Sequence, residues 1–446
     1  MTHSKSKIQN PKFSLPRYPR YKDSGVEWLG AVPVHWEVRS LRGILKERGE
    51  TNEGTKTDFI LSVMKDRGVI PYTEKGNVGN KMSEDITTYK IVCPGDLVIN
   101  KMNAIIGSLG ISEYHGALSK VYFVMQPRYD YLNNRFYGYL FQIRDFQKSL
   151  SKISYGIMEL RESINFNEFK NLPLPLPPKP EQERIVSFLD QKTVEIDALI
   201  AKKQRQIELL DEQKAILINR AVTRGLNPNA KLKPSGIEWI GEIPAHWEVV
   251  QLKRCVGEQE YGLSEPSTDE GDYTYLGMGQ IQKMKIVPDG ANRLNKCPSN
   301  LILQDKDLLF NRTNSFDLVG KTGIYRSVDF EFSQTITYAS YLVRLRTSII
   351  ADPEWLNLLM GDDSFLLEAR SMALRSLNQA NLTFSRVGQI YVPLPPVDEQ
   401  MQIVAWLSDC FARVATATES IDRQIQSLKS LRSTLIAHAV TGRIKI

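Results

Sequence analysis

The chain has 446 residues, of which 42% are hydrophobic and 24% charged, enough to bury the cores of two to four domains. No apolar run approaches the roughly 20 residues of a membrane span, and the polar N-terminus lacks the apolar centre of a signal peptide, so we expect a cytoplasmic protein with no membrane contact. The net charge is +6, but residues 226–397 hold 17 Lys and Arg against 20 Asp and Glu, so charge alone favours nucleic-acid binding only slightly. The four cysteines form no Cys-x-x-Cys pair, so we expect reduced thiols and no metal site.

Residues 1–20 are predicted to be a basic tail, because the first 22 positions hold six Lys and Arg and no acidic residue. A globular domain is expected at 21–180, and its opening block, residues 24–38, reads SGVEWLGAVPVHWEV. Residues 96–103, DLVINKMN, form a β-rich run that ends in polar residues, which indicates a strand leading into a loop. Residues 129–150 have the pattern of an amphipathic helix. A proline-rich junction, LPLPP followed by KPEQ, closes the domain.

These blocks recur in the same order further along the chain. Residues 235–249, SGIEWIGEIPAHWEV, repeat the opening block at an offset of 211, and residues 307–314, DLLFNRTN, repeat the strand-to-loop block at the same offset. Residues 392–396, VPLPP, repeat the junction at an offset of 218 and also lead into Glu-Gln. The chain is therefore a tandem duplication of about 215 residues. We expect a second domain at 232–397, with an amphipathic helix at 353–373, and an α/β (α+β) fold for both copies.

Long helices are predicted at 181–224 and 398–440, within spacer segments 181–231 and 398–446, because neither stretch contains Pro or Gly. In a heptad frame both carry apolar rows in the same register. Each would be about 60 Å long, too long to bury its stripe against one small domain. We therefore expect an antiparallel coiled coil between the two domains and a pseudo-two-fold repeat. The residues expected to form this spacer and to dock partner subunits are Leu189, Ile196, Ile207, Leu210, Leu217, Leu407, Val414, Ile421, Ile425, Leu428 and Leu435.

Three motifs, each present twice and in this order, carry a resemblance to a known family. They are W-[LI]-G-x-[VI]-P-x-H-W-E-V, D-L-[VL]-x-N-[KR] and P-L-P-P-x-x-E-Q. Together they resemble the specificity subunit of Type I restriction-modification systems, over nearly the whole chain from about residue 21. The resemblance implies two target recognition domains that each read a few base pairs of double-stranded DNA, at a bipartite site with a gap of fixed length.

The resemblance also implies the partners. The helices would act as a spacer and dock two methyltransferase subunits, and the family also includes complexes with restriction subunits, which supply motor and nuclease activity. The chain itself would be non-catalytic and hold no cofactor. S-adenosylmethionine would be bound by the methyltransferase subunits, which methylate adenine.

Candidate DNA contacts follow from the chemistry of base reading, in which Arg and Lys suit guanine and Asn and Gln suit adenine. They lie in the strand-to-loop blocks, in the polar stretches before each junction, and in a weaker set near residues 65–81. The candidates are Lys65, Lys81, Asn100, Lys101, Asn103, Tyr155 and Arg161 in the first half, and Asn311, Arg312, Asn314, Arg375, Asn378 and Gln379 in the second. The alternative for each is an ordinary turn or connecting loop, where Asn is favoured for its backbone geometry.

Catalytic interpretations find little support. His35 and His246 lie in the most strongly repeated block, which a duplicated packing motif explains better than catalysis. Gly320-Lys321-Thr322 resembles the end of a phosphate-binding loop, but Ser315 stands where the first glycine should be. The sequence contains neither Asn-Pro-Pro-aromatic nor Asp-Pro-Pro-Tyr, the active-site motifs of DNA methyltransferases of this kind. Two alternatives remain: a duplicated protein-binding scaffold without DNA readout, and a methyltransferase or nuclease that acts alone.

Overall fold

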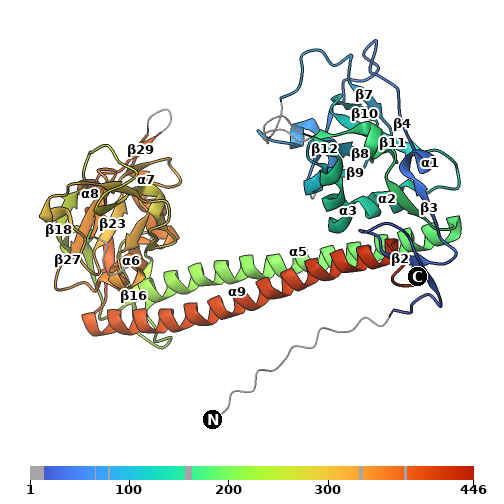
Figure 1. The fold of residues 1–446 in the computed structure, drawn as a ribbon. Helices are drawn as coiled ribbons and strands as arrows, with labels where there is room; N and C mark the ends of the chain where they lie inside the picture. The colour runs from blue at the N-terminus through green and yellow to red at the C-terminus, as the bar shows by residue number, and fades with distance from the viewer. Residues whose placement is uncertain (1–14, 66, 79–80, 156–162, 331–334, 376–378) are drawn as a thin grey trace. The chain divides into compact units, whose positions relative to one another are not determined.

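The computed structural model describes residues 15–446 except 66, 79–80, 156–162, 331–334 and 376–378. Contacts divide the chain into two compact units, Met1–Lys203 with Arg423–Ile446, and Gln204–Asp422. Each unit contains one globular domain together with the start of one long helix and the end of the other (Figure 1). Among the described residues, no helix is long and apolar enough to cross a membrane.

The first domain is built on a four-stranded antiparallel sheet. Its order is β4 (Leu45–Glu47), β11 (Tyr122–Pro127), β8 (Leu97–Asn100) and β9 (Leu109–Ile111). All four residues of β8 are buried, as the continuous apolar run predicts for a central strand. Smaller two-stranded pairs surround this sheet: β1 (Tyr21–Asp23) with β2 (Ala31–Pro33), β3 (Glu37–Ser40) with β14 (Pro173–Leu176), β5 (Leu61–Met64) with β6 (Gly68–Pro71), β7 (Lys90–Val92) with β10 (Gly116–Leu118), and β12 (Ser154–Tyr155) with β13 (Ser163–Ile164).

The second domain enlarges the same plan. Its six-stranded sheet has the order β18 (Val256–Tyr261), β27 (Leu342–Thr347), β23 (Leu308–Asn311), β25 (Thr322–Ile324), β21 (Lys285–Ile286) and β20 (Ile281–Gln282). Two three-stranded sheets accompany it: β22 (Asn292–Leu294), β19 (Tyr273–Leu276) and β26 (Thr335–Tyr338), and β24 (Thr313–Asn314), β29 (Ala380–Asn381) and β28 (Leu374–Arg375). The remaining strands pair as β15 (Leu232–Pro234) with β16 (Glu242–Pro244), and β17 (Glu248–Gln251) with β30 (Tyr391–Leu394).

Helices lie between the strands of both domains, which confirms the α+β expectation. The first domain holds α1 (Leu41–Ile44), α2 (Asn134–Phe141), α3 (Arg144–Ser149) and α4 (Phe166–Phe169), and the second holds α6 (Pro353–Met360), α7 (Asp363–Ser371) and α8 (Phe384–Val387). The single amphipathic helices predicted at 129–150 and 353–373 are each two helices. In the second domain Asp362 causes the break, because its carboxylate accepts from the N–H groups of Ser364 and Phe365 and so starts a new helix.

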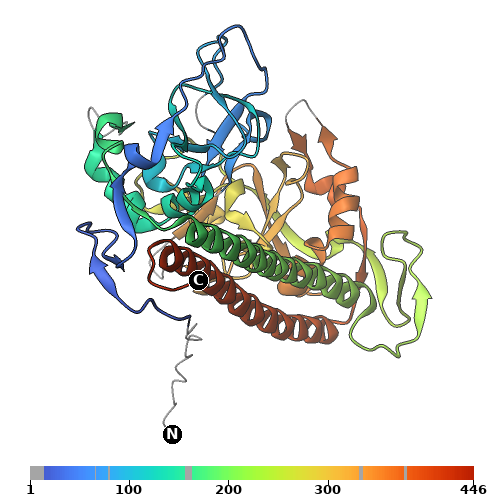
Figure 2. The ribbon, with the colours of Figure 1, turned by 90° about the vertical axis from the view of Figure 1, so that its right-hand side faces the viewer.

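The long helices are α5 (Lys179–Arg224) and α9 (Val397–Val440), which span roughly 70 and 66 Å at 1.5 Å per residue. They pack side by side and antiparallel in both views (Figures 1 and 2), as predicted, because the start of α5 shares a unit with the end of α9. All eleven predicted stripe residues are buried or half-buried. Two basic residues in the stripe also find partners: Arg432 pairs with Asp197 at 3.0 Å, and the Lys214 ammonium lies 5.3 Å from the ring of Phe411.

A duplicated joint attaches each domain to its own long helix. In the first half, the Trp36 indole N–H donates to Glu181 Oε2 at 2.7 Å, and His35 Nε2 lies 2.8 Å from Glu181 Oε1. In the second half, Trp247 donates to Glu399 Oε2 at 2.9 Å, and His246 Nε2 lies 2.7 Å from the same oxygen. Both histidines therefore belong to packing motifs that connect the opening block to the Glu-Gln of the junction.

The glutamines of the two junctions extend the joint into the domain cores. Gln182 and Gln400 are 0% exposed. The side-chain oxygen Oε1 of Gln182 accepts from the backbone N–H of Asn133 at 2.8 Å, and Oε1 of Gln400 accepts from the backbone N–H of Asp352 at 2.7 Å. Asn133 and Asp352 are the N-caps of α2 and α6, so each junction fixes the equivalent helix of its domain.

The opposite long helix completes each joint. Gly225, which follows α5, and Gly442, which follows α9, have φ angles of +69° and +72°, a conformation that favours glycine at a helix end. A β-carbon at Gly225 would lie 3.0 Å from the ring of Trp247, and one at Gly442 would lie 3.1 Å from the ring of Trp36. Each domain is therefore closed by the start of one long helix and the end of the other.

Candidate nucleic-acid interface

The strand-to-loop blocks place Lys101 and Arg312 at equivalent positions, directly after the central strands β8 and β23. The Lys101 carbonyl accepts from the N–H of Ile164 at 3.0 Å, and the Arg312 carbonyl accepts from the N–H of Leu382 at 2.8 Å. The polar stretch before each junction therefore folds back beside the end of the central strand. In each half the fold brings together the two main candidate regions, which are separated by about 60 residues in the sequence.

The aspartate that opens each block holds the central strand in place. Asp96 accepts two hydrogen bonds from Arg48, at 2.7 and 3.0 Å, and Asp307 accepts two from Arg346, at 2.8 and 3.2 Å. Both carboxylates are 3% exposed. These hydrogen bonds raise the pKa of each guanidinium above its usual range, so both arginines stay charged. The repeated aspartates therefore have a structural role and leave the polar strand ends as the candidate contacts.

In the second domain, the candidates gather around the sheet β24–β29–β28. Asn314 and Arg375 both pair with Ala380, so their side chains lie on one face of this sheet. The Arg375 guanidinium lies 3.5 Å from the ring centroid of Phe316, and Gln379 is exposed. This face therefore carries polar groups that are stacked or open to solvent.

Two other candidates of the second domain differ from this group. Asn311 is 1% exposed, and its amide oxygen is buried without a hydrogen-bond partner among the described residues, which favours a structural role. Asn378 lies outside the described residues, as does Arg161 of the first domain. Strand β12 contains Tyr155.

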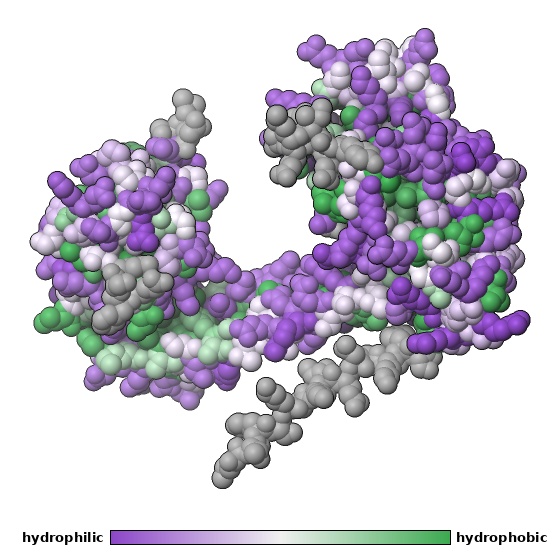
Figure 3. Space-filling model, viewed as in Figure 1, coloured by the Kyte–Doolittle hydropathy of each residue, from purple (hydrophilic) through white to green (hydrophobic). Residues whose placement is uncertain are grey.

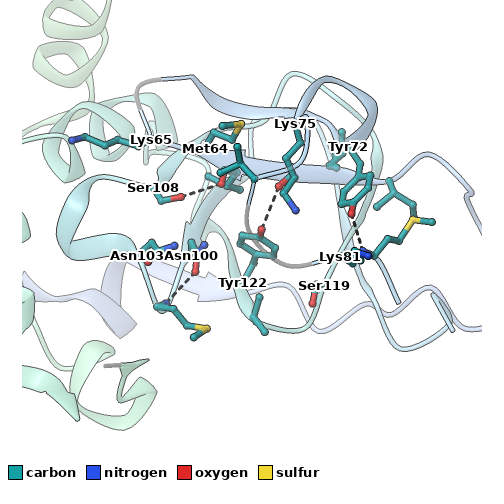
Figure 4. A pocket seen from close by; sticks show the side chains of 18 of the residues that line it. Met64, Lys65, Tyr72, Lys75, Lys81, Asn100, Asn103, Ser108, Ser119 and Tyr122 are labelled. Atoms are coloured by element: carbon teal, nitrogen blue, oxygen red, sulfur yellow. Dashed lines mark hydrogen bonds between the residues drawn. The ribbon is translucent and has the colours of Figure 1, made fainter. Parts of the chain in front are cut away.

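In the first domain, four candidates line one cavity of about 360 Å³: Lys65, Lys81, Asn100 and Asn103. Figure 4 shows them around Tyr72, Lys75 and Tyr122, which line the same cavity. The Asn100 amide oxygen accepts from the N–H of Met102 at 3.1 Å, and Asn100 is 9% exposed. Asn100 therefore acts as a turn residue, while the lysines and Asn103 are the more accessible polar groups.

Aromatic partners of the arginines were missed by sequence reasoning. The Arg312 guanidinium lies 5.1 Å from the ring centroid of Tyr261, which ends strand β18 two strands away in the six-stranded sheet. In the sequence, Tyr261 is recognisable as an aromatic residue at the end of a polar strand. Its contact with Arg312 depends on the order of the strands in the sheet. By contrast, Gly320-Lys321-Thr322 leads into strand β25 and not into a helix, as expected of a chance match.

Hydrophilic side chains predominate on the visible face of each globular domain (Figure 3). The described residues contain no cluster of three or more His, Cys, Asp or Glu that could hold a metal ion. Each domain therefore offers polar side chains where the central strand of its sheet ends.

Comparisons with known proteins agree with this arrangement. The model of the Type I restriction modification DNA specificity domain matches residues 33–209 and again residues 244–427. The Type I restriction enzyme MjaVIII specificity subunit of Methanocaldococcus jannaschii is 24% identical over 431 residues, which cover 93% of this chain and 94% of the relative. The Type I restriction enzyme EcoKI specificity subunit of Escherichia coli is 24% identical over 300 residues, which cover 65% and 62%.

A solved structure shares the fold. One of its chains, from work on "complex assembly" and "conformational transition of the type I R-M system", superimposes with a TM-score of 0.67 at 16% identity and covers 92% of this chain and 98% of its own length. The chain therefore contains two copies of one domain on an antiparallel helix pair, which is the architecture of a protein with two recognition surfaces. The chain belongs to the Type I restriction-modification DNA specificity family and carries its domain twice. It is a specificity subunit, with no catalytic activity of its own.

Proposed function

We propose that the chain reads a bipartite site in double-stranded DNA, with residues 21–180 reading one half-site and residues 232–397 reading the other. The observation that carries this proposal is that one scaffold presents different side chains in its two copies. Lys101 and Arg312 have equivalent backbone hydrogen bonds, yet their surroundings differ. Asn100 and Asn103, on either side of Lys101, line a cavity that also contains three lysines, whereas Arg312 lies over an aromatic ring. Two readers of this kind recognise two different half-sites.

The helix pair then acts as a spacer and as the docking surface for partners. Four large apolar side chains of α5 are exposed, at 48–69%: Val194, Leu199, Leu209 and Ile216. Exposed apolar groups on a helix that already buries its own stripe support docking of further subunits. We propose two methyltransferase subunits, which bind S-adenosylmethionine and methylate adenine in the cytoplasm, with restriction subunits as further partners.

The test is to express the chain with its methyltransferase subunit in a host without adenine methylation and to map methyladenine by single-molecule sequencing. We expect one new motif with two short parts and a fixed gap. Lys101→Ala should relax one part, and Arg312→Ala the other. If no motif forms while the same methyltransferase is active with another specificity subunit, DNA readout is wrong and the protein-binding scaffold is favoured.

A further inference from the structure

Arg312 lies against an aromatic ring at the surface of the second domain. Its guanidinium carbon lies 5.1 Å from the centroid of the Tyr261 ring, and its side chain is half-buried. Several arginines of the domain pair with carboxylates, as Arg326 does with Glu354 and Arg346 with Asp307, whereas Arg375 lies over the ring of Phe316. Arg312 is packed against an aromatic ring, and among the described residues it forms no ion pair with a carboxylate.

The backbone around Arg312 is fixed on both sides. Its N–H donates to the Tyr341 carbonyl at 3.0 Å, and its carbonyl accepts from Leu382 at 2.8 Å. The next residues, Thr313–Asn314, continue into strand β24. Because the main chain and the ring both constrain it, the side chain has little freedom left to lose when it binds a ligand.

The donors that remain available are the terminal amino groups. Nε of Arg312 is buried, and among the described residues it has no acceptor. The two Nη atoms form the outer edge of the planar group, which can donate two parallel hydrogen bonds to two acceptors in one plane. In the major groove, guanine presents such a pair with O6 and N7.

The first domain lacks this arrangement at the equivalent position. Lys101 replaces Arg312, and Glu50 stands at the offset of 211 where Tyr261 stands in the second half. A lysine ammonium is a flexible point charge without planar geometry. The two copies therefore share the scaffold and differ in the chemistry of the side chain at this position.

We infer that Arg312, oriented by Tyr261, reads a guanine in the second half-site through the guanine O6 and N7 atoms. Tyr261 is a positioning residue, because it acts through the guanidinium and not on the base. This inference rests on the proposed function, since it assigns a base to one of the two readers.

The test uses the complex of the full chain with its methyltransferase subunits and a duplex that carries the mapped motif. Each guanine of the second half-site, on either strand, is replaced in turn by 7-deazaguanine, which removes the N7 acceptor and keeps the Watson–Crick pair. Affinity is measured by competition at one fixed salt concentration, because phosphate contacts depend strongly on salt. For the unaltered chain we expect a loss of roughly 5- to 150-fold at one guanine.

Four variants separate base reading from general binding. Arg312→Met keeps an unbranched side chain against Tyr261 but has no donor, so it should bind unmodified DNA less tightly, with no further loss on 7-deaza substitution. Tyr261→Ala should reduce the 7-deaza effect, whereas Tyr261→Phe, which keeps the ring, should preserve it. Lys101→Ala, at the matched position of the other domain, should leave the effect unchanged. All four must assemble with the methyltransferase subunits.

The inference is overturned if the second half-site contains no G·C pair, or if Arg312→Met loses as much affinity on 7-deaza substitution as the unaltered chain does. A 7-deaza effect that Tyr261→Ala leaves at full size would overturn the positioning role. These outcomes differ from failure of the proposed function, in which the complex shows no preference for a bipartite site at all.

Discussion

Removing the carboxylate of Glu399 should destabilise the second unit by an amount that follows from the joint. Trp247 is 0% exposed, and its indole N–H donates to Glu399 at 2.9 Å. With Glu399→Ala this N–H is left buried without its acceptor, at a cost of about 1–3 kcal/mol. Loss of an acidic residue from the first turn of α9 adds about 0.3–1 kcal/mol. The unfolding free energy should therefore fall by about 1–4 kcal/mol.

The assay is equilibrium urea unfolding of the full chain, with hydrogen exchange of strand β17 to locate the unit that opens. Glu399→Gln keeps an oxygen acceptor for Trp247 and should lose less, about 1 kcal/mol. Glu183→Ala is the control, because Glu183 lies in an exposed part of α5, 3.9 Å from Lys179, and should change stability by less than about 0.5 kcal/mol. If Glu399→Ala behaves like this control, the joint does not hold the domain as we infer.

Three further predictions test other parts of the molecule. Insertion of one heptad after Lys203 and another after Asp422 lengthens the paired helices by about 10.5 Å. Because DNA rises about 3.4 Å per base pair, the gap of the methylation motif should widen by about three base pairs. An unchanged gap in an active complex would refute the spacer role. Asp307→Ala leaves its arginine partner without a buried carboxylate and should cost about 3 kcal/mol in thermal or urea unfolding, and a loss below about 1 kcal/mol would contradict this. Burial raises the pKa of the Cys255 thiol to about 11, so this thiol stays protonated at pH 8. Iodoacetamide should therefore label the more accessible Cys297 first in the native protein, as followed by mass spectrometry. Equal labelling rates of the two cysteines would argue against the burial of Cys255.

Much of the architecture could be predicted because duplication makes the important positions recognisable. Trp36 and Trp247 stand out by repetition, and the heptad rows of the two long helices share one register. The partners of the repeated residues could not be predicted in the same way. Glu181 contacts Trp36, which is 145 positions away in the sequence. Arg48, directly after β4, and Arg346, within β27, reach equivalent aspartates. Such contacts depend on strand order, which periodicity does not specify.

The candidate interface shows the same limit. The strand-to-loop residues and the pre-junction residues were each recognisable as polar runs, but their proximity follows from the bonds of Ile164 and Leu382 to the strand ends. Asn311 is repeated, and its repetition could be taken for function, yet it is 1% exposed. A residue can thus be repeated because both domains need it for folding, and repetition alone does not identify a DNA contact.

The residues that are the same in both copies therefore differ in place from those that are not: the former include those that attach each domain to the helix pair, and the latter include candidate DNA contacts. Trp36 and Glu181 recur as Trp247 and Glu399, with the same atoms in contact. This agreement means that the same geometric requirement acts at both joints, where each domain meets the helix pair. Directly after the central strands the two copies differ, with Lys101 in one and Arg312 in the other, as we expect if these side chains face DNA in the complex that we propose. A duplicated specificity subunit can thus change what either half reads without altering how that half is held.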